Sequence, residues 1–287
     1  MHICSSISMM TLFFNFNGKF LKNGTGIAGP GNRGLRYGDG LFETMSVLGS
    51  QILYKDLHFK RLFSGLKVLQ FIQPQHFNSL YFENQILALC KKNKIPEPAR
   101  VRLMIFRGEG GLYDPENHLP NYAIEAWHNS VPDELNRNGL VVDIYHDVKK
   151  SCDILSNLKT NNFLPYVLAA NFAKKHQLND ALILNTHNRI CDSTIANVFA
   201  ITGNEIITPA LSEGCVAGVM REWLIQTLPS YGYIVSETVI TVEKLKEAEG
   251  VFLTNVIKGI RWVKSFNGVD YSADEISKLF NLVNSKK

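Results

Sequence analysis

The first sixty residues have the pattern of antiparallel strands joined by tight turns. Residues 12–22 place the pair Asn17-Gly18 between two apolar stretches, and Asn-Gly is a strong signal for a hairpin turn. Residues 41–54 alternate between apolar and polar positions, turn at Gly49-Ser50 and continue as a second strand. The pattern therefore predicts two hairpins.

A helical pattern begins near residue 56. Leu57, Leu62, Leu66 and Leu69 recur at helical spacing, and Asp56 before them is expected to be the N-cap. The pattern further predicts a helix at about 76–93 and strands at 100–107 and 121–127.

Residues 128–138 are polar, contain Pro132 and show no periodicity, which is typical of a linker. This linker would separate a smaller N-terminal α/β domain, residues 1–127, from a larger C-terminal domain, residues 139–287. The later pattern predicts strands at 139–147, 181–185, 197–201 and 206–208, and helices at 164–176 and 218–228. We therefore expect a two-domain α/β (α+β) fold.

Composition excludes several classes of protein. Of the 287 residues, 45% are hydrophobic and 20% are charged, as in an ordinary globular protein. The formal net charge is +4 and the basic residues are spread along the chain, so we expect no nucleic-acid partner. No run of eighteen apolar residues occurs, so we expect no membrane span.

The cysteines and the first residues bear on the cellular compartment. The five cysteines form no Cys-x-x-Cys pair, which argues against a disulfide framework or structural zinc site and favours the cytoplasm. Residues 1–14 lack the basic and long apolar regions of a signal peptide. Met9 or Met10 would also serve as a start, and we expect translation to begin at one of them.

Two charged residues stand at the ends of predicted elements. Lys159 lies in a polar loop before a helix, in the stretch SNLKTNNFLPYVLAA, where a lone Lys is normally solvated. Asp192, in ICDSTIANVFAI, lies at the end of an apolar strand. A carboxylate here could keep the pyridinium nitrogen of pyridoxal phosphate protonated, which makes the ring an electron sink. The alternative for Asp192 is an ordinary turn residue.

A phosphate could bind near Gly218. This glycine precedes an apolar helix, so the amides of Val219 and Met220 would point out of the helix N-terminus, where unsatisfied N–H groups and the dipole favour an anion. The same segment could equally be a simple loop-to-helix turn. Further phosphate contacts could come from three residues elsewhere in the chain, Arg61, Thr254 and Asn255.

Taken in order, these stretches resemble the class IV aminotransferases, the fold-type IV family of pyridoxal-phosphate enzymes. The resemblance extends from about Phe16 to about Val263. Its elements are R-x-x-x-x-GDG-x-F-E at 33–43, H-x-x-R-L at 58–62, the lysine region, acid-x4-Asn-x-F at 192–199 and G-[VI]-x-R at 218–221. Five ordered elements make a specific signature.

The resemblance implies a two-domain enzyme with pyridoxal 5′-phosphate in the crevice between its domains. Lys159 would form the Schiff base and act as acid and base on the substrate carbon. Asp192, where the family usually has Glu, would face the ring nitrogen. The phosphate would be held by Arg61, Val219, Met220, Thr254 and Asn255. The resemblance also implies a homodimer that acts on a small amino-acid substrate.

Three branches of the family are candidates. The spacing Lys159-x-x-Asn162 is similar to the 4-amino-4-deoxychorismate lyases and the D-amino-acid aminotransferases, and Glu43-Thr44-Met45 lacks the E-G-x-R of branched-chain enzymes. Three stretches are similar to the lyases, namely Arg107–Tyr113, Gly218–Arg221 and Phe252–Asn255. The preferred expectation is therefore a lyase that releases pyruvate and 4-aminobenzoate from aminodeoxychorismate. D-amino-acid or branched-chain transamination stays open.

In the lyase interpretation Arg107 would bind a substrate carboxylate, and Tyr37 is expected to contact the substrate as well. The alternative for Arg107 is a strand-end Arg paired with an acid.

Two other classes are less consistent with the sequence. A scaffold without cofactor would have no need of Lys159, Arg61 and both phosphate loops. The eight histidines show no metal-ligand spacing, so we expect no metal, and no G-x-S-x-G nucleophile motif occurs.

Overall fold

The computed structural model describes residues 12–130 and 134–284. The chain divides into two units, one of Met1–Val131 with Lys159–Asn162, the other of Pro132–Leu158 with Phe163–Lys287. The division lies inside the segment 128–138 that the sequence predicts as a linker. Residues 159–162 differ from the predicted domain bounds, because they belong to unit 1. The predicted start at Met9 or Met10 lies outside the described residues.

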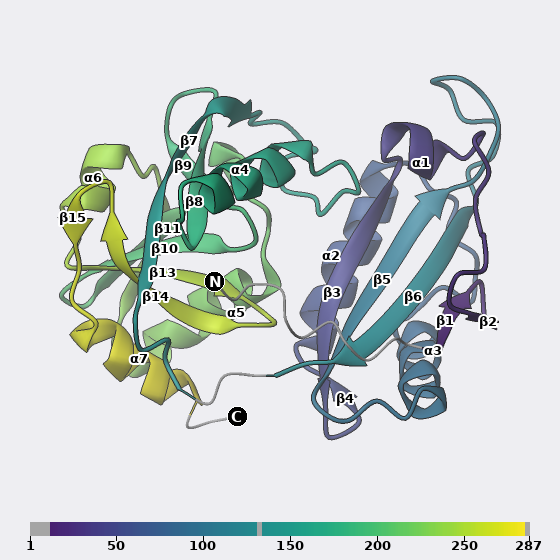
Figure 1. Ribbon diagram of the computed structural model, residues 1–287, viewed down its shortest axis with the longest axis horizontal. Coiled ribbons are helices and arrows are strands. Elements are labelled where there is room, and N and C mark those ends of the chain that lie inside the picture. Colours follow the sequence, from purple (N-terminus) through teal and green to yellow (C-terminus); the bar gives the residue numbers. More distant parts are fainter. Residues whose placement is uncertain (1–11, 131–133, 285–287) are drawn as a thin grey trace. The chain divides into compact units, whose positions relative to one another are not determined.

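Unit 1 is built on a six-stranded antiparallel sheet with the order β2-β1-β6-β5-β3-β4 (Figure 1). Its strands are β1 (Phe13–Phe16), β2 (Lys19–Lys22), β3 (Gly40–Leu48), β4 (Gln51–Ile52), β5 (Ala99–Arg107) and β6 (Pro120–His128). Both predicted hairpins are confirmed. Asn17 and Gly18 have positive φ angles, as do Gly49 and Ser50, and such backbone matches the twist of the paired strands.

The helices of unit 1 are α1 (Arg33–Tyr37), α2 (Lys55–Val68) and α3 (Ser79–Lys92). The prediction that Asp56 caps α2 is wrong. The chain leaves β4 through Tyr54 in the left-handed conformation, with φ 55°, so helical geometry already begins at Lys55. Asp56 lies in the first turn, where its negative charge still suits the helix dipole.

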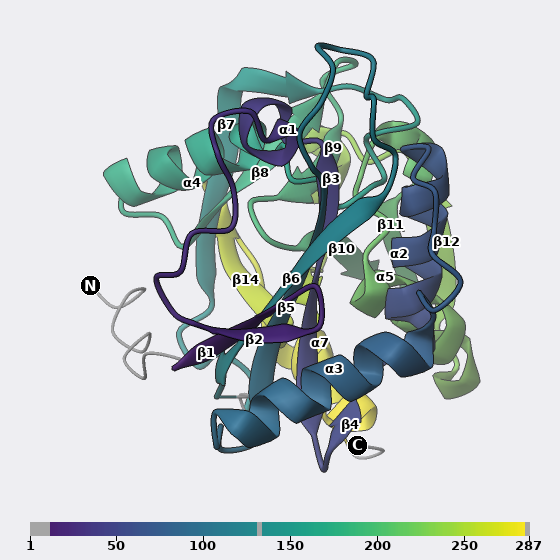
Figure 2. The ribbon, with the colours of Figure 1, turned by 90° about the vertical axis from the view of Figure 1, so that its right-hand side faces the viewer.

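Helices α2 and α3 lie against the sheet of unit 1 (Figure 2). An aromatic cluster joins them to it. Phe82 of α3 is fully buried, and its ring lies 6.3 Å from that of Phe59 on α2 and 5.3 Å from that of Tyr122 on β6. The rings of Phe59 and Phe82 are stacked, whereas those of Phe82 and Tyr122 meet edge to face. Aromatic pairs of either kind add about 0.5–1.5 kcal/mol per pair beyond the buried area. The side chains that α2 turns toward β3 therefore stand on a rigid base.

Residues 159–162 extend the free edge of β3. Phe42 N donates to Lys159 O at 2.9 Å, and Asn161 N donates to Gly40 O at 2.9 Å. A Cβ at Gly40 would lie 2.5 Å from Asn161 Nδ2, and 2.2 Å from Ile105 O of β5 on the other side, so only glycine allows this close packing on both sides of β3. These backbone contacts are the physical reason why Lys159 belongs to unit 1.

Unit 2 is built on a nine-stranded mixed sheet. The path β12-β11-β10-β13-β14-β7-β8-β9 is parallel at β11–β12, β14–β7 and β7–β8, and β15 pairs with β14. The strands are β7 (Leu140–Lys150), β8 (Asp180–Asn185), β9 (Ile190–Ser193), β10 (Asn197–Thr202), β11 (Glu205–Pro209), β12 (Ile234–Thr238), β13 (Gly250–Asn255), β14 (Gly259–Phe266) and β15 (Val269–Asp270). The mixed architecture confirms the predicted α/β (α+β) class.

The helices of unit 2 are α4 (Leu164–Lys175), α5 (Val219–Thr227), α6 (Val242–Lys246) and α7 (Asp274–Asn284), with short 3-10 turns at Leu211–Glu213 and Leu228–Tyr231. A buried apolar core lies between the sheet and these helices, and includes Val198, Val251, Leu253 and Phe266. Every residue of β9 and β13 except Asn255 is buried. Among the described residues, no helix is both long and apolar enough to cross a membrane.

Candidate active site

Lys159 lies against an aromatic ring of unit 1. Its Nζ is 4.5 Å from the centroid of the Phe42 ring, and the guanidinium of Arg102 on β5 is 4.0 Å from the same centroid. Such distances are those of cation–π contacts. Because Phe42 also bonds the Lys159 backbone, the lysine is held at both its main chain and its side chain.

Glu43 of β3 links two side chains of α2. Its carboxylate accepts from Arg61 Nε at 2.7 Å and Nη2 at 2.5 Å, and lies 2.7 Å from His58 Nδ1. Burial alone would raise the pKa of Glu43, but Arg61 and His58 lower it to about 2. Burial lowers the pKa of His58 despite the contact with Glu43, so the imidazole is neutral near pH 7. Arg61, the predicted phosphate ligand, is thus oriented by a bidentate ion pair.

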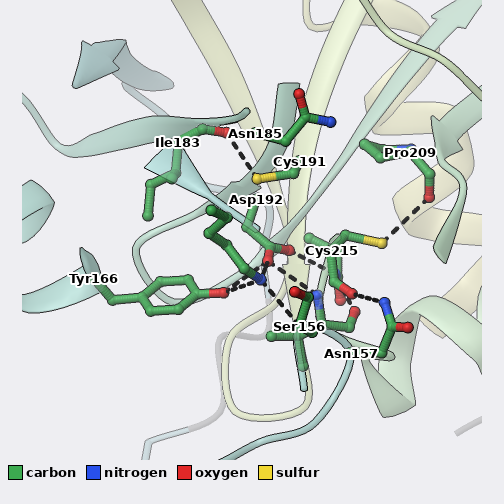
Figure 3. A network of polar contacts seen from close by, with 12 residues as sticks. Ser156, Asn157, Tyr166, Ile183, Asn185, Cys191, Asp192, Pro209 and Cys215 are labelled. Carbon is green, nitrogen blue, oxygen red and sulfur yellow. Dashed lines mark hydrogen bonds and ion pairs between the residues drawn. The ribbon is translucent and has the colours of Figure 1, made fainter. Parts of the chain in front are cut away.

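In unit 2, Asp192 is the centre of a buried polar network (Figure 3). Its Oδ2 accepts from Lys150 Nζ at 2.9 Å, from the Tyr166 hydroxyl at 2.8 Å and from Val216 N at 3.0 Å. Its Oδ1 accepts from Asn197 Nδ2 at 3.0 Å. Four donors from four different segments therefore fix this carboxylate in one orientation.

Lys150 and Tyr166, which both contact Asp192, also contact each other. Lys150 Nζ also donates to the Tyr166 hydroxyl at 2.6 Å and to Ser156 O at 3.2 Å. Burial lowers the pKa of Lys150, but the Asp192 carboxylate more than compensates, and the net direction is upward. Burial raises the pKa of Tyr166 well above its usual value, with Asp192 adding to it, so this phenol stays neutral. The network is an ion pair of Lys150 and Asp192 bridged by a hydroxyl.

The start of α5 lies beside this network. Gly218 is the N-cap of α5 and offers no side-chain cap, so the first amides of the helix, those of Val219 and Met220, have no partner within it. A Cβ at Gly218 would lie 1.8 Å from Asn197 Oδ1, which shows that Asn197 packs directly under this helix start. Asn197 in turn pairs with Thr254 across β10 and β13. The Asp192 carboxylate and the start of α5 are therefore joined through one residue, Asn197.

Thr254 carries the clearest sign of an absent partner. Its side chain is 1% exposed, and its Oγ1 has no hydrogen-bond partner among the described residues. A buried hydroxyl without a partner is costly, which points to a ligand that would accept its hydrogen bond. Asn255, by contrast, accepts from Ile257 N and Lys258 N and so closes the turn after β13.

The two predicted substrate ligands lie in unit 1. Arg107 is 3% exposed; its Nε donates to Asp39 at 3.0 Å and its Nη2 to Leu69 O at 2.6 Å. These are the contacts of a strand-end Arg paired with an acid, the alternative that the sequence left open. The ring of Tyr37, the last residue of α1, lies 5.8 Å from that of Tyr113 in a tilted arrangement. Their predicted roles toward a substrate stay predictions.

The family model described as "Amino-transferase class IV" matches residues 40–266. This range includes Arg61 and Lys159 of unit 1 and Asp192 and Thr254 of unit 2. The chain belongs to the amino-transferase class IV family. The predicted family resemblance is thereby confirmed, and so is the prediction that the chain is an enzyme.

Individual class IV relatives cover most of the chain. The aminodeoxychorismate lyase of Vibrio harveyi is 27% identical over 251 residues, 85% of this chain and 89% of that protein. The D-alanine aminotransferase of Listeria monocytogenes serotype 4b is 26% identical over 252 residues, 83% of this chain and 82% of that protein. The fold matches the 4-amino-4-deoxychorismate lyase structure from Pseudomonas aeruginosa with a TM-score of 0.83 at 24% identity, over 95% of this chain and 98% of that chain.

Four residues of this class IV chain that surround the predicted ones were not themselves predicted. Glu43 pairs with Arg61 and bonds His58, and Lys150 and Tyr166 both bond Asp192. Glu43 and His58 stand inside the quoted motifs, where their charges could have been paired with Arg61. Lys150 gave no signal, because the strand before it was expected to end at residue 147, whereas β7 continues to Lys150.

Proposed function

We propose that this chain is a pyridoxal 5′-phosphate enzyme that acts as a 4-amino-4-deoxychorismate lyase. When bound, the cofactor supplies a ring that withdraws electrons from the carbon bearing the substrate's amino group. The observation that carries the cofactor assignment is the buried, unpartnered hydroxyl of Thr254 next to the uncapped start of α5. The likeness to the Vibrio harveyi protein supports the choice of reaction.

The residues of unit 2 fit this cofactor. A phosphate dianion would complete the hydrogen bond of Thr254 Oγ1 and would accept from the amides of Val219 and Met220. Asp192 would accept from the ring nitrogen at Oδ1, the oxygen with a single described donor. From unit 1, Arg61 would add a cation to the phosphate and Lys159 the reactive amine. Asn255 is proposed as a supporting contact only, since its side chain already closes a turn.

Lys159 would move a proton during the reaction. Its amine would take the proton from the carbon bearing the amino group, as a positioned general base. In a lyase, loss of the pyruvate unit from the neighbouring carbon follows and leaves the aromatic 4-aminobenzoate. In a transaminase, Lys159 would instead return the proton to a carbon of the cofactor. Arg107 and Tyr37 would meet the carboxylate-bearing substrate.

A product assay tests the reaction. Purified protein with added pyridoxal phosphate is incubated with 4-amino-4-deoxychorismate, and 4-aminobenzoate and pyruvate are measured together. The two products are expected in equal amounts from the native enzyme, none from Lys159→Ala, and native yield from the matched control Lys174→Ala, an exposed lysine of α4. Glutamate formed from an amino-acid donor and 2-oxoglutarate, without 4-aminobenzoate, would make the enzyme a transaminase.

A second assay tests the choice of lysine, since Lys150 is also buried beside the predicted ring-nitrogen ligand. Borohydride reduction of the loaded enzyme, followed by peptide mapping, is expected to leave the pyridoxyl group on Lys159. A label on Lys150 would overturn this part of the proposal. We further propose that the enzyme is a cytoplasmic homodimer, and light scattering of the loaded enzyme checks the dimer.

A further inference from the structure

Lys150 is a buried lysine for which the proposed reaction has no use. It is 8% exposed, and all three hydrogens of its ammonium have acceptors, on Asp192, Tyr166 and Ser156. Taking an ammonium out of water is expensive unless it is paired and fully hydrogen-bonded. The chain thus keeps a buried, fully paired cation against the carboxylate that would face the cofactor's ring nitrogen.

The shape of β7 directs Lys150 inward. β7 and β8 pair in parallel up to Tyr145 and Ile183, and the register then jumps so that Lys149 pairs with Leu184. Such an irregularity changes the direction of a strand and re-aims the side chains that follow. Lys150 then lies opposite Asn185, inside unit 2, while Lys149 is only half-buried.

The charges around Asp192 limit what the carboxylate can do. Lys150 already compensates its negative charge, and burial raises the pKa values of the neighbouring thiols, Cys191 and Cys215, so neither adds charge near neutral pH. A protonated ring nitrogen at Oδ1 would be a second cation on the same carboxylate. Like charges close together disfavour the charged form of each group.

We propose that Lys150 is a positioning residue that pairs with Asp192 and orients it, and thereby limits how strongly this carboxylate draws a proton onto the cofactor's ring nitrogen. Tyr166 assists, because its hydroxyl bridges the two charges. The inference rests on the proposed function, since it needs pyridoxal phosphate facing Asp192. It also explains how the shorter Asp serves where the family usually has Glu: four donors hold it in place.

The test is nitrogen-15 NMR of the full-length protein loaded with pyridoxal phosphate labelled at the ring nitrogen. The variants are Lys150→Met, which removes the charge at similar volume, Lys150→Arg, which keeps it, and Lys149→Met as the control on the same strand. In Lys150→Met the ring nitrogen should move toward its protonated form, with its apparent pKa raised by about one unit, a tenfold change in the ratio of protonated to neutral ring. Lys150→Arg and Lys149→Met should match the native protein.

A purely structural Lys150 would lower Tm without moving the ring-nitrogen signal toward the protonated form. An unchanged signal, or a shift toward the neutral form because Asp192 itself takes a proton, therefore overturns the inference. If Lys150→Met does not fold, Tyr166→Phe removes one donor from Asp192 Oδ2 and should shift the signal in the same direction by a smaller amount. No signal from bound cofactor in the native protein would refute the proposed function, and the inference with it.

Discussion

Replacing Thr254 by Val should change stability and cofactor affinity in opposite directions. Thr254 Oγ1 is buried without a partner among the described residues, and Val has nearly the same shape without the hydroxyl. An unsatisfied buried hydroxyl costs about 1–3 kcal/mol. Thr254→Val should therefore raise the free energy of unfolding of the cofactor-free protein by about 1 kcal/mol, or about 2–4 °C in Tm for a unit of this size.

The same substitution should weaken the binding of pyridoxal phosphate. In the proposed site the hydroxyl donates to the phosphate, and a hydrogen bond to a charged group contributes about 1.5–3 kcal/mol. The Kd should accordingly rise about 10- to 100-fold. If Thr254→Val makes the cofactor-free protein more stable and binds the cofactor more weakly, the hydroxyl serves to bind a ligand. A hydroxyl that supports the fold would instead make the variant less stable.

Thr208 provides the matched control. It is also fully buried, but its Oγ1 donates to Val198 O at 2.8 Å. Thr208→Val should destabilise the cofactor-free protein by about 1 kcal/mol and leave the Kd unchanged. Thermal unfolding without cofactor and an absorbance titration with cofactor measure the two effects separately. The reasoning is refuted if Thr254→Val destabilises the empty protein as Thr208→Val does, or if its Kd stays native.

Three further predictions concern charge and packing. Asp192→Asn should keep bound cofactor, seen by its visible absorption, but slow the step in which Lys159 removes a proton; native turnover would exclude the ring-nitrogen role. Glu43→Gln should destabilise the protein at pH 7 by about 3 kcal/mol, because it breaks a buried ion pair. The pKa of Glu43 in the folded protein, about 2, lies below its usual 4.5. The stabilisation by its ionised form is therefore present above pH 4.5 and is lost as the pH falls toward 2. Urea titrations should show a smaller difference in the free energy of unfolding between native and variant protein at pH 3 than at pH 7. Gly218→Ala should abolish cofactor binding, since its Cβ would clash with Asn197 Oδ1. Gly26→Ala, where a Cβ has open space and φ is not positive, is the comparison and should bind cofactor as the native protein does.

Local sequence patterns predicted much of the fold. The pair Asn17-Gly18 predicted its hairpin, since few residues accept positive φ angles in a two-residue turn. The helix predicted at 218–228 is confirmed as α5, Val219–Thr227. The cap of α2 was predicted incorrectly, because a left-handed Tyr54 is not a pattern that Asp56 reveals.

The features that were not predicted depend on contacts between segments far apart in the sequence. No local rule indicates that residues 159–162 pair with β3, because that pairing joins segments more than one hundred residues apart. The role of Lys150 depends on a register shift between β7 and β8, which has no signature in the sequence of either strand. The sequence therefore predicted the charged residues Arg61 and Asp192 of the candidate site. It did not predict their partners of opposite charge, Glu43 and Lys150.

Those opposite charges bear on the reaction itself. Arg61 is paired with Glu43 and Asp192 with Lys150, so two of the charged groups proposed for the cofactor are already neutralised within their own units. A ring nitrogen that Asp192 protonates only weakly makes the ring a weaker electron sink. Transamination needs the ring to hold the negative charge until a proton returns, whereas in an elimination the leaving group carries that charge away. The ion pair of Lys150 and Asp192 therefore favours the lyase reaction. Removing the pair in Lys150→Met should raise the rate of transamination relative to the rate of pyruvate release.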